Sequence, residues 1–244
     1  MPSFDPKRPP TFPASEISLF LDFDGTLVRL AERPDGVVVE RSLLSLLGHL
    51  SSRLSGRVAL LSGRSIAQLD ALLGGMAIAM AGSHGGEIRH CGMAAAPVSR
   101  PSALAIVAAE FADAFRDTDG VIIEVKTLGV ALHYRLDPKA APAIHSLAAR
   151  LGAEHGLDLQ RGKMMVELRT TGHDKGTALT AMMQDPPFAG HTPVFLGDDV
   201  TDEDGFAACA ALGGAGILVG PERQSAARYR LDDVADVHRW LSAL

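Results

Sequence analysis

Two aspartates follow directly after a short apolar segment, in residues 19–27 (LFLDFDGTL). An apolar run of this length is typical of a strand buried on both faces of a parallel sheet. In such sheets, ligands bind where the carboxyl ends of the strands open into loops. Two carboxylates held there repel one another unless a cation or a proton relieves the repulsion. Asp22 and Asp24 therefore indicate a cation-binding or catalytic site. The same residues are also compatible with an Asp-Gly turn that follows a core strand and has no chemical role.

Two further apolar segments, residues 57–61 and 193–196, are predicted to be buried strands that also end in polar residues. Acidic residues that only cap a helix would stand in its first turn, whereas the carboxylates after residue 196 stand at the strand end itself. Residues 57–61 are followed by Ser62, Gly63 and Arg64, of which Ser62 offers a hydroxyl that can bind a phosphate oxygen. Residues 193–196 are followed, after one glycine, by Asp198 and Asp199.

Lys175 follows Asp174, the expected N-cap of a helix. A lysine in the first turn adds a cation where the helix dipole is already positive, which is unfavourable unless an anion lies there. His84 stands in a glycine-rich segment after a predicted strand near 77–81, and an ordinary turn residue is the alternative for it. Gly25 allows a sharp turn after the paired aspartates, and Thr26 offers a hydroxyl and an amide just beyond it.

The strand ends together form a set of hard oxygen ligands with one ammonium and one hydroxyl. Mg²⁺ prefers one or two carboxylates, several waters and a substrate phosphate, whereas softer metals favour the thiolates and imidazoles that this set lacks. Phosphoryl transfer requires mainly positioning and neutralisation of charge on the phosphoryl oxygens. The sequence therefore predicts a Mg²⁺-dependent phosphoryl-transfer site at Asp22, Asp24, Ser62, Lys175, Asp198 and Asp199.

The elements that must position these residues alternate between apolar strands and amphipathic helices, which predicts an α/β fold with a parallel sheet. Helices are expected near 40–53 and 65–73, and a final strand and helix near 215–219 and 234–241. We assign residues 14–99 and 171–244 to this core. Five prolines in residues 1–13 predict a flexible or extended arm before it.

Residues 100–170 have a different periodicity and are predicted to be an inserted α+β domain. Two helical stripes accompany segments near 121–126, 130–135 and 163–169 in which apolar and polar residues alternate, and residues 156–160 are expected to add a fourth strand. Alternation is typical of an antiparallel sheet with one face covered. Its open face would gather charges of both signs, as a polyhydroxylated anionic ligand requires, but a solvated surface is equally compatible. The charged residues are Glu124, Lys126, His133, Arg135, Lys163, Glu167 and Arg169.

Composition narrows the class of protein. A chain of 244 residues with 47% hydrophobic residues suits a core with an insertion, and its net charge of −6 argues against nucleic-acid binding. Two cysteines form neither a disulfide framework nor a metal site, and no segment is long enough to span a bilayer. We expect a soluble, cytoplasmic monomer that binds neither nucleic acid nor membrane.

The four motifs resemble, in the same order, those of the haloacid dehalogenase-like superfamily, whose members are mostly phosphatases with an aspartate nucleophile. Over nearly the whole chain beyond the arm, the sequence resembles more narrowly the trehalose-6-phosphate phosphatase family. Two positions depart from that family's pattern, at residues 169–172 and at Gly205, and they concern the hinge and cap rather than the catalytic set. The resemblance rests on Asp22–Leu27, Ser62-Gly63-Arg64, Gly82-Ser83-His84-Gly85, His133-Tyr134-Arg135, Lys163, Glu167, Lys175-Gly176 and residues 197–203 (GDDVTDE).

The resemblance implies a Rossmann-like core with a cap that selects the substrate, and hydrolysis of trehalose 6-phosphate to trehalose and phosphate through an aspartyl-phosphate. It makes Asp22 the nucleophile and Asp24 the general acid and then base. Mg²⁺ would be held by Asp22, the backbone carbonyl of Asp24 and Asp198, supported by Asp199 and Asp202. Substrate would be bound by Gly25, Thr26, Gly63, Arg64 and His84 in the core and by Glu124, Lys126, Arg135, Lys163 and Glu167 in the cap.

Two alternatives remain open from the sequence. The same catalytic motifs would serve a phosphatase or mutase for another sugar phosphate, such as sucrose phosphate or mannosylglycerate phosphate. A receiver-like phosphorylation switch or a sugar-phosphate sensor also uses acidic residues, a hydroxyl and a lysine on a parallel sheet. A receiver is much shorter, however, and lacks an inserted domain.

Overall fold

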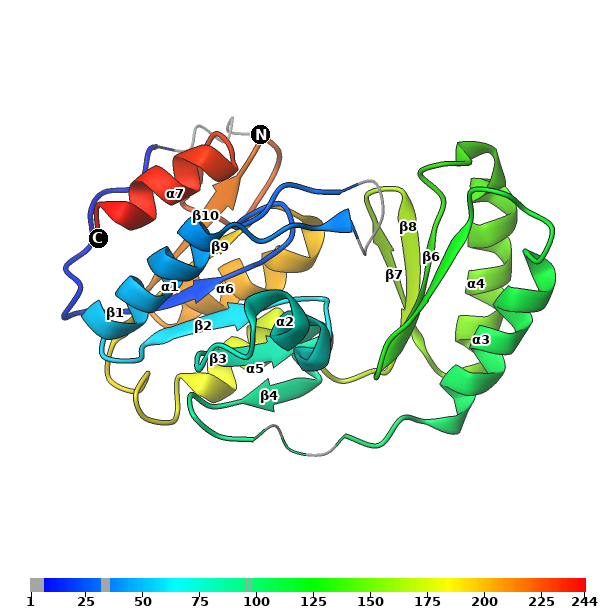
Figure 1. The fold of residues 1–244 in the computed structure, drawn as a ribbon, viewed down its shortest axis with the longest axis horizontal. Helices are drawn as coiled ribbons and strands as arrows, with labels where there is room; N and C mark the ends of the chain where they lie inside the picture. The colour runs from blue at the N-terminus through cyan, green and yellow to red at the C-terminus, as the bar shows by residue number, and fades with distance from the viewer. Residues whose placement is uncertain (1–6, 32–35, 95, 97) are drawn as a thin grey trace. The chain divides into compact units, whose positions relative to one another are not determined.

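The computed structural model describes residues 7–31, 36–94, 96 and 98–244, and these residues form two compact units. In the larger unit, Val37–Ala96 and Asp174–Leu244 join the chain that ends at Leu30. The smaller unit consists mainly of residues 98–173, so it is inserted between two segments of the larger one (Figure 1).

The described part of the larger unit is built on a seven-stranded sheet in the order β11-β10-β9-β1-β2-β3-β4. All neighbouring strands are parallel except β3 and β4. The first strand lies in the middle, with Leu19 opposite Val58 of β2 and Val194 of β9, and its five residues are all buried. The strands are β1 Ile17–Leu21, β2 Val58–Leu61, β3 Ala79–Gly82, β4 Glu87–Arg89, β9 Thr192–Gly197, β10 Ala215–Val219 and β11 Tyr229–Leu231.

Helices cover both faces of this sheet, which explains why its central strands are apolar throughout. Figure 1 shows α1 and α7 in front of the sheet, and α5 and α6 behind it. On the α5–α6 face, aromatic rings fill the core: Phe20 stacks on Phe188 with centroids 5.3 Å apart, and Phe195 lies 5.4 Å from Phe206. The helices are α1 Arg41–Arg53, α2 Ile66–Leu73, α5 Lys175–Met182, α6 Glu203–Ala211 and α7 Val234–Ser242.

The smaller unit has its own antiparallel sheet, in the order β5-β6-β8-β7, and its own core. Its two helices pack on one face of the sheet, where Phe111 of α3 and Ile144 of α4 are fully buried with Leu132 and Val166 of the strands. The elements are α3 Ser102–Ala114, β5 Ile122–Val125, β6 Gly129–His133, α4 Ala141–His155, β7 Asp158–Gly162 and β8 Met165–Arg169.

These two architectures confirm the predicted α/β fold with an inserted domain of two helices and an antiparallel sheet. Two edge strands, β4 and β11, were not predicted, because each has only three residues and a charged residue among them. Such short segments become strands through pairing with a neighbour rather than through their own pattern.

The predicted arm lies in part outside the described residues, since residues 1–6 are not described. Beyond them, Lys7 pairs with Tyr229 of β11 in a parallel bridge, and Phe12 packs edge-on against Tyr229 and Trp240 with centroids 6.1 Å from each. The segment from Lys7 to Pro13 is therefore extended along the larger unit.

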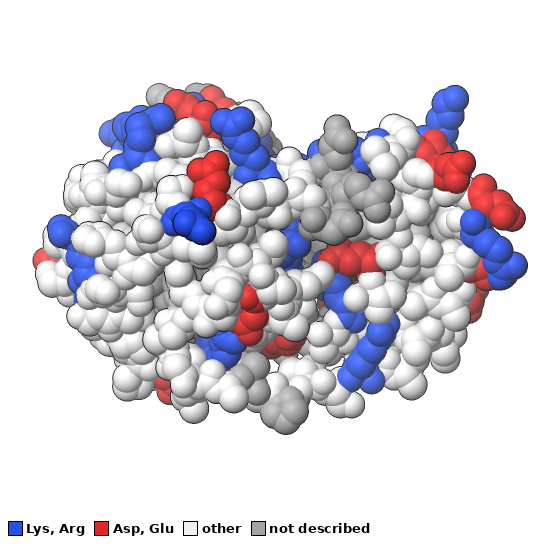
Figure 2. Space-filling model, in the orientation of Figure 1, with Lys and Arg blue, Asp and Glu red and all other residues white. Residues whose placement is uncertain are grey.

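The described surface carries charges of both signs. Figure 2 shows Lys and Arg side chains interspersed with Asp and Glu side chains on the face drawn, in keeping with the modest net charge of −6. Among the helices of the described residues, none is long and apolar enough to cross a membrane.

Candidate active site

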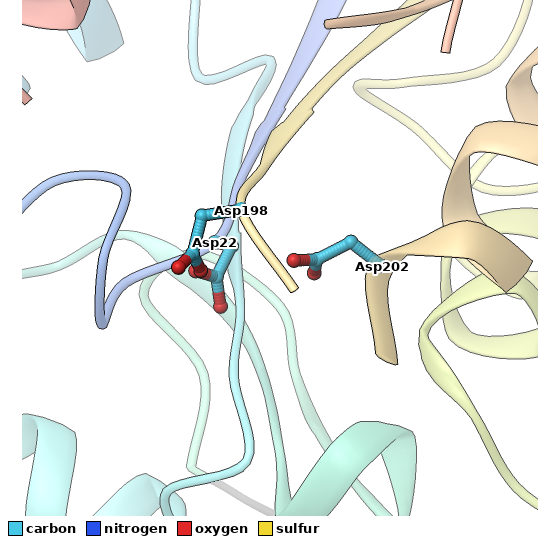
Figure 3. Close-up of side chains that lie close together, drawn as sticks. All are labelled: Asp22, Asp198 and Asp202. Atoms are coloured by element: carbon cyan, nitrogen blue, oxygen red, sulfur yellow. The ribbon is translucent and has the colours of Figure 1, made fainter. Parts of the chain in front are cut away.

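Three buried carboxylates converge where β1 and β9 end (Figure 3). Asp22 follows β1, and Asp198 follows β9. These strands are parallel neighbours with Leu21 opposite Leu196, so the two aspartates emerge side by side. Asp202 approaches from the 3-10 turn Val200–Asp202, and one oxygen atom from each carboxylate lies within 4.8 Å of the others. The predicted gathering of carboxylates from two strands is thus present in the structure.

Lys175 lies inside this cluster. Its Nζ donates to Oδ1 of Asp22 and to Oδ1 of Asp202, both at 2.6 Å, and its side chain is 3% exposed. The structure therefore supplies anions for the lysine that the sequence places at a positive helix end. Burial alone lowers the pKa of Lys175, but the charges of Asp202 and Asp22 outweigh it and raise that pKa above its usual value.

Asp174 is the N-cap of α5, as predicted, and fixes where Lys175 begins the helix. Its side chain accepts from the backbone N–H of Thr177 at 2.7 Å, while the Thr177 hydroxyl binds the Asp174 backbone N–H at 2.9 Å. This capping box orients the first turn of α5, and with it the lysine, toward the carboxylates.

The oxygens of the cluster differ in what they bind. Both oxygens of Asp202 are engaged, since its Oδ2 accepts from the backbone N–H of Asp199 at 2.8 Å. Oδ2 of Asp22, by contrast, is buried and has no hydrogen-bond partner among the described residues. A buried carboxylate oxygen without a donor, next to a second carboxylate, is a position that suits a cation. The cluster of Asp22, Asp198 and Asp202 could therefore hold a cation, with Oδ2 of Asp22 available to it and both oxygens of Asp202 already engaged.

Burial raises the pKa of Asp22 well above its ordinary value, and the nearby charges of Asp202 and Asp198 raise it further. Lys175 acts in the opposite direction and stabilises the ionised form. A divalent cation at the cluster would act in the same direction as Lys175, because it favours the charged carboxylate.

Gly25 is required at its position by the loop that follows β1. Its φ is +93°, in the region that favours glycine, and a Cβ atom there would lie 2.2 Å from Oδ2 of Asp198. The glycine thus allows the β1 loop to approach the carboxylate at the end of β9. Thr26 lies next to it with a fully buried hydroxyl that has no hydrogen-bond partner in the described part of the chain.

Asp24 is held by an arginine from the neighbouring strand end. Arg64 Nε donates to Oδ2 of Asp24 at 2.6 Å, and its Nη2 donates to Oδ1 at 2.8 Å. The backbone N–H of Arg64 binds the Ser62 hydroxyl at 3.1 Å, so the predicted hydroxyl also shapes this loop. Sequence reasoning placed Arg64 with the substrate and did not pair it with Asp24.

His84 lies against the same loop in a backbone conformation that is rare outside glycine. Ser83, His84 and Gly85 have φ angles of 49°, 55° and 102°. The His84 ring covers Gly63, where a Cβ atom would lie 2.6 Å from its Nε2, and the His84 backbone N–H binds the Ser62 carbonyl at 2.9 Å. His84 is therefore buried against the loop that follows β2.

Glu87 is a buried residue near the site that sequence reasoning missed. Its Oε1 accepts from the Ser83 hydroxyl, and its Oε2 accepts from the backbone N–H of Ile66 at the start of α2 at 3.3 Å. It thus ties the two loops beside Asp22 together. A glutamate four residues after a serine gives no distinctive signal, because the residues share one buried space only once β3 and β4 have paired.

In the smaller unit, the predicted charged residues gather on the sheet face away from the helices. Glu124, Ala131 and Glu167 are paired across three strands and so share that face. Glu167 is 1% exposed and forms a buried ion pair with Lys126 at 2.6 Å, whereas Lys163 is exposed. Other contacts among the predicted residues join His133 Nε2 with Glu124 Oε2 at 2.8 Å, and Arg135 Nη2 with the Lys163 carbonyl at 3.3 Å.

A sequence model of trehalose-phosphatases matches residues 20–235, which is most of the chain. The chain belongs to the trehalose-phosphatase family. It is 39% identical over 233 residues to the trehalose-6-phosphate phosphatase of Escherichia coli (strain K12), covering 95% of this chain and 87% of that protein. It is also 40% identical over 206 residues to a probable trehalose-phosphate phosphatase of Sinorhizobium fredii, covering 84% of this chain and 78% of that protein.

Solved structures confirm the fold of this family member. The C-terminal domain of Candida albicans trehalose-6-phosphate phosphatase superposes with a TM-score of 0.82 at 22% identity, covering 94% of this chain and 92% of that one. A trehalose-6-phosphate phosphatase related protein superposes with a TM-score of 0.76 at 27% identity, covering 93% of this chain and 96% of that one. A haloacid dehalogenase-like hydrolase from Bacteroides thetaiotaomicron superposes with a TM-score of 0.66 at 16% identity, covering 93% of this chain and 98% of that one. The chain is thus a phosphatase by its family, and its fold is haloacid dehalogenase-like.

Proposed function

We propose that the chain hydrolyses trehalose 6-phosphate to trehalose and phosphate, with Mg²⁺ as cofactor and a phosphorylated Asp22 as intermediate. The observation that carries the chemistry is the buried Asp22, which lies between Lys175 and Asp198 with one oxygen unpartnered. The substrate is supported by the family and by the named activity of the relative from Escherichia coli, which matches 95% of this chain.

Asp22, the backbone carbonyl of Asp24 and Asp198 would hold Mg²⁺, with Asp199 and Asp202 supporting the loop and the lysine. The hydrogen bonds support the different roles of Asp22 and Asp202, since both oxygens of Asp202 are engaged while Oδ2 of Asp22 has no hydrogen-bond partner among the described residues. The roles of the Asp24 carbonyl and of Asp199 are taken from the family resemblance. When bound, Mg²⁺ supplies positive charge against the phosphoryl oxygens and relieves the repulsion between the carboxylates.

In the first step, an oxygen of Asp22 attacks phosphorus, and the bond between phosphorus and the sugar oxygen breaks. Asp24 gives its proton to that leaving oxygen, so trehalose departs neutral. The Lys175 ammonium stays beside Asp22, where it favours the ionised nucleophile. We assign binding of the phosphoryl group to the strand-end residues Gly25, Thr26, Ser62, Gly63, Arg64 and His84.

In the second step, Asp24 takes a proton from a water molecule as the water attacks the phosphorus of the aspartyl-phosphate. The bond between phosphorus and Asp22 breaks, inorganic phosphate leaves, and Asp22 returns as a carboxylate. Asp24 therefore ends the cycle protonated, ready to serve as acid again, and no further reactant is needed.

The smaller unit, as the cap of residues 100–170, would select the sugar, with the core taking residues 14–99 and 171–244. The phosphate group is common to all phosphomonoesters, so discrimination between sugars must come from groups that bind hydroxyls. Charged side chains of both signs on one sheet face can do this. The proposed contacts are Glu124, Lys126, Arg135, Lys163 and Glu167.

Turnover of a substrate panel tests this function. The purified chain, expected to be a monomer by size-exclusion chromatography, is assayed with trehalose 6-phosphate, sucrose 6-phosphate, mannosylglycerate phosphate and an aryl phosphate, with Mg²⁺ and with EDTA. We expect Mg²⁺-dependent turnover of the aryl phosphate and of trehalose 6-phosphate, with the highest kcat/KM for trehalose 6-phosphate. A higher kcat/KM for another sugar phosphate would reassign the substrate, and no turnover of the aryl phosphate would favour a binding module.

A further inference from the structure

Arg223 lies beside the metal-binding loop and has no part in the function described so far. It follows β10 in the sequence, and its guanidinium group bonds two distant partners as well as the neighbouring backbone carbonyl of Gln224, at 3.1 Å. Nη1 contacts the Glu203 carboxylate in a close ion pair, and Nη2 donates to the backbone carbonyl of Asp199 at 2.8 Å. A planar guanidinium can make both contacts in a fixed geometry, which a lysine ammonium does not match.

Glu203 anchors this arginine. Its Oε2 accepts from the backbone N–H of Ala226 at 2.7 Å and from the Ser225 hydroxyl at 3.2 Å, while Oε1 contacts Arg223. The carboxylate is thus bonded on both oxygens to the segment that follows β10. Glu203 therefore bonds residues outside its own helix, although an acidic residue in a first turn is commonly only a cap.

The loop that carries Asp198 is consequently held at two successive peptide groups. Asp202 binds the N–H of Asp199, and Arg223 binds the carbonyl of the same residue. Asp202 is itself fixed by Lys175. Asp198 is covalently attached to this restrained peptide, and its carboxylate lies in contact distance of Gly25.

We propose that Arg223 is a positioning residue for metal binding, which acts through the Asp199 carbonyl to hold Asp198 in its ligating position, with Glu203 as its anchor. The inference rests on the proposed Mg²⁺ site. Residues that orient the direct ligands of a metal typically change its affinity by about 10- to 100-fold when they are replaced.

Metal binding, measured apart from turnover, tests the proposal. Mg²⁺ is titrated into the full chain by calorimetry, and the rise of Tm with Mg²⁺ concentration is recorded for the wild type, Arg223→Ala, Arg223→Lys and Glu203→Gln. We expect Arg223→Ala to weaken Mg²⁺ binding about 10- to 100-fold, with Arg223→Lys only partly restoring it. Kinetically, the Mg²⁺ concentration for half-maximal activity should rise by the same factor, while KM for substrate changes little.

Arg230→Ala is the matched control. Arg230 also donates to a backbone carbonyl, that of Gly220 at 2.8 Å, and pairs with Asp232, but it touches neither Asp199 nor Glu203 in the contacts described. Its loss should leave Mg²⁺ affinity unchanged. Wild-type Mg²⁺ affinity in a folded Arg223→Ala or Arg223→Lys variant would contradict the inference, and the proposed function would be unaffected. If the wild type itself bound no Mg²⁺, that result would contradict the proposed cofactor instead.

Discussion

Arg64 and Asp24 form a two-point ion pair, with Nε to Oδ2 at 2.6 Å and Nη2 to Oδ1 at 2.8 Å. Both oxygens of the proposed acid–base residue are therefore engaged by one guanidinium. Each carboxyl oxygen has a second lone-pair position, at which Asp24 can carry the proton for the leaving oxygen while the arginine holds it. The arginine thus sets the position of Asp24.

Asp24→Asn should lower kcat about 10²- to 10⁴-fold for trehalose 6-phosphate, since proton transfer from a positioned group contributes about that much. An aryl phosphate has a good leaving group and needs little protonation, so its phosphorylation of Asp22 should suffer less. Steady-state rates on both esters with one enzyme preparation measure the difference. Equal losses on the two substrates would contradict a role of Asp24 as the acid, and would leave it the role of base in the breakdown of the aspartyl-phosphate that both substrates form.

Asp22→Asn should abolish turnover, because an amide cannot act as the nucleophile. The fold should survive, since the side chains are nearly the same size and Lys175 keeps its bond to Asp202. Mass spectrometry of acid-quenched wild-type enzyme should find phosphate on the peptide that contains Asp22, and none on the variant. Residual Mg²⁺-dependent turnover by the variant would contradict the assignment.

Lys163→Ala should reduce kcat/KM for trehalose 6-phosphate about tenfold or more, since a hydrogen bond to a charged group is worth about 1.5–3 kcal/mol. Hydrolysis of an aryl phosphate should change little. Lys163 is exposed, so its loss should not affect folding. Lys139→Ala, which removes another exposed lysine of the same unit, is the control. Similar losses of kcat/KM in both variants would mean that Lys163 is an ordinary solvated residue without a specific contact to the substrate.

Glu167→Ala is a less direct test of the same face. Glu167 and Lys126 form an ion pair with side chains only 2% and 6% exposed. Removing one partner of a buried pair leaves an uncompensated charge and costs about 3–5 kcal/mol. A fall in activity of this variant must therefore be read together with its Tm.

Asp236 provides a pH dependence of stability. Burial alone would raise the pKa of Asp236, but hydrogen bonds from the backbone N–H of Asp232 and from Arg8 and Arg239 lower it below its usual value. A carboxylate with a lowered folded-state pKa stabilises the fold above its unfolded pKa of about 3.9, and this stabilisation is lost as pH falls through the folded value.

Asp236→Asn should therefore lower Tm at pH 7, and the difference from the wild type should shrink as the pH falls below about 4. Thermal unfolding at several pH values measures this. Asp232→Asn is the control, because that side chain is 68% exposed in its pair with Arg230 and such pairs contribute little. A constant difference in Tm across the range would mean that Asp236 stays ionised, or acts only by packing.

Much of this arrangement could be predicted from the sequence, because buried parallel strands are apolar throughout and their ends carry the polar residues. The positions of Asp22 and Asp198 follow from this rule. The partners of these residues could not be predicted: Arg64 with Asp24, and Arg223 with Asp199, depend on how loops from different strands meet.

Gly205 shows how a departure from a family pattern can have a packing reason. It replaces a residue that is usually larger, and a Cβ atom there would lie 2.4 Å from the ring of Phe195 in β9. The ring occupies the space that a side chain would need. A position in β9 and one in α6 are thus matched in size, which the sequence of one chain does not reveal.

The position of β1 in the middle of the sheet has a consequence for synthesis on the ribosome. One of its two neighbours, β9, begins at Thr192, after the whole smaller unit has been made. At about 5 to 20 residues per second, roughly ten seconds or more pass before that strand emerges. Meanwhile the apolar edge of β1 in the nascent chain stays open to chaperones, whereas the smaller unit already has every strand of its own sheet. Chains stalled before Thr192 should resist protease across residues 102–169 and be cut near residues 17–21.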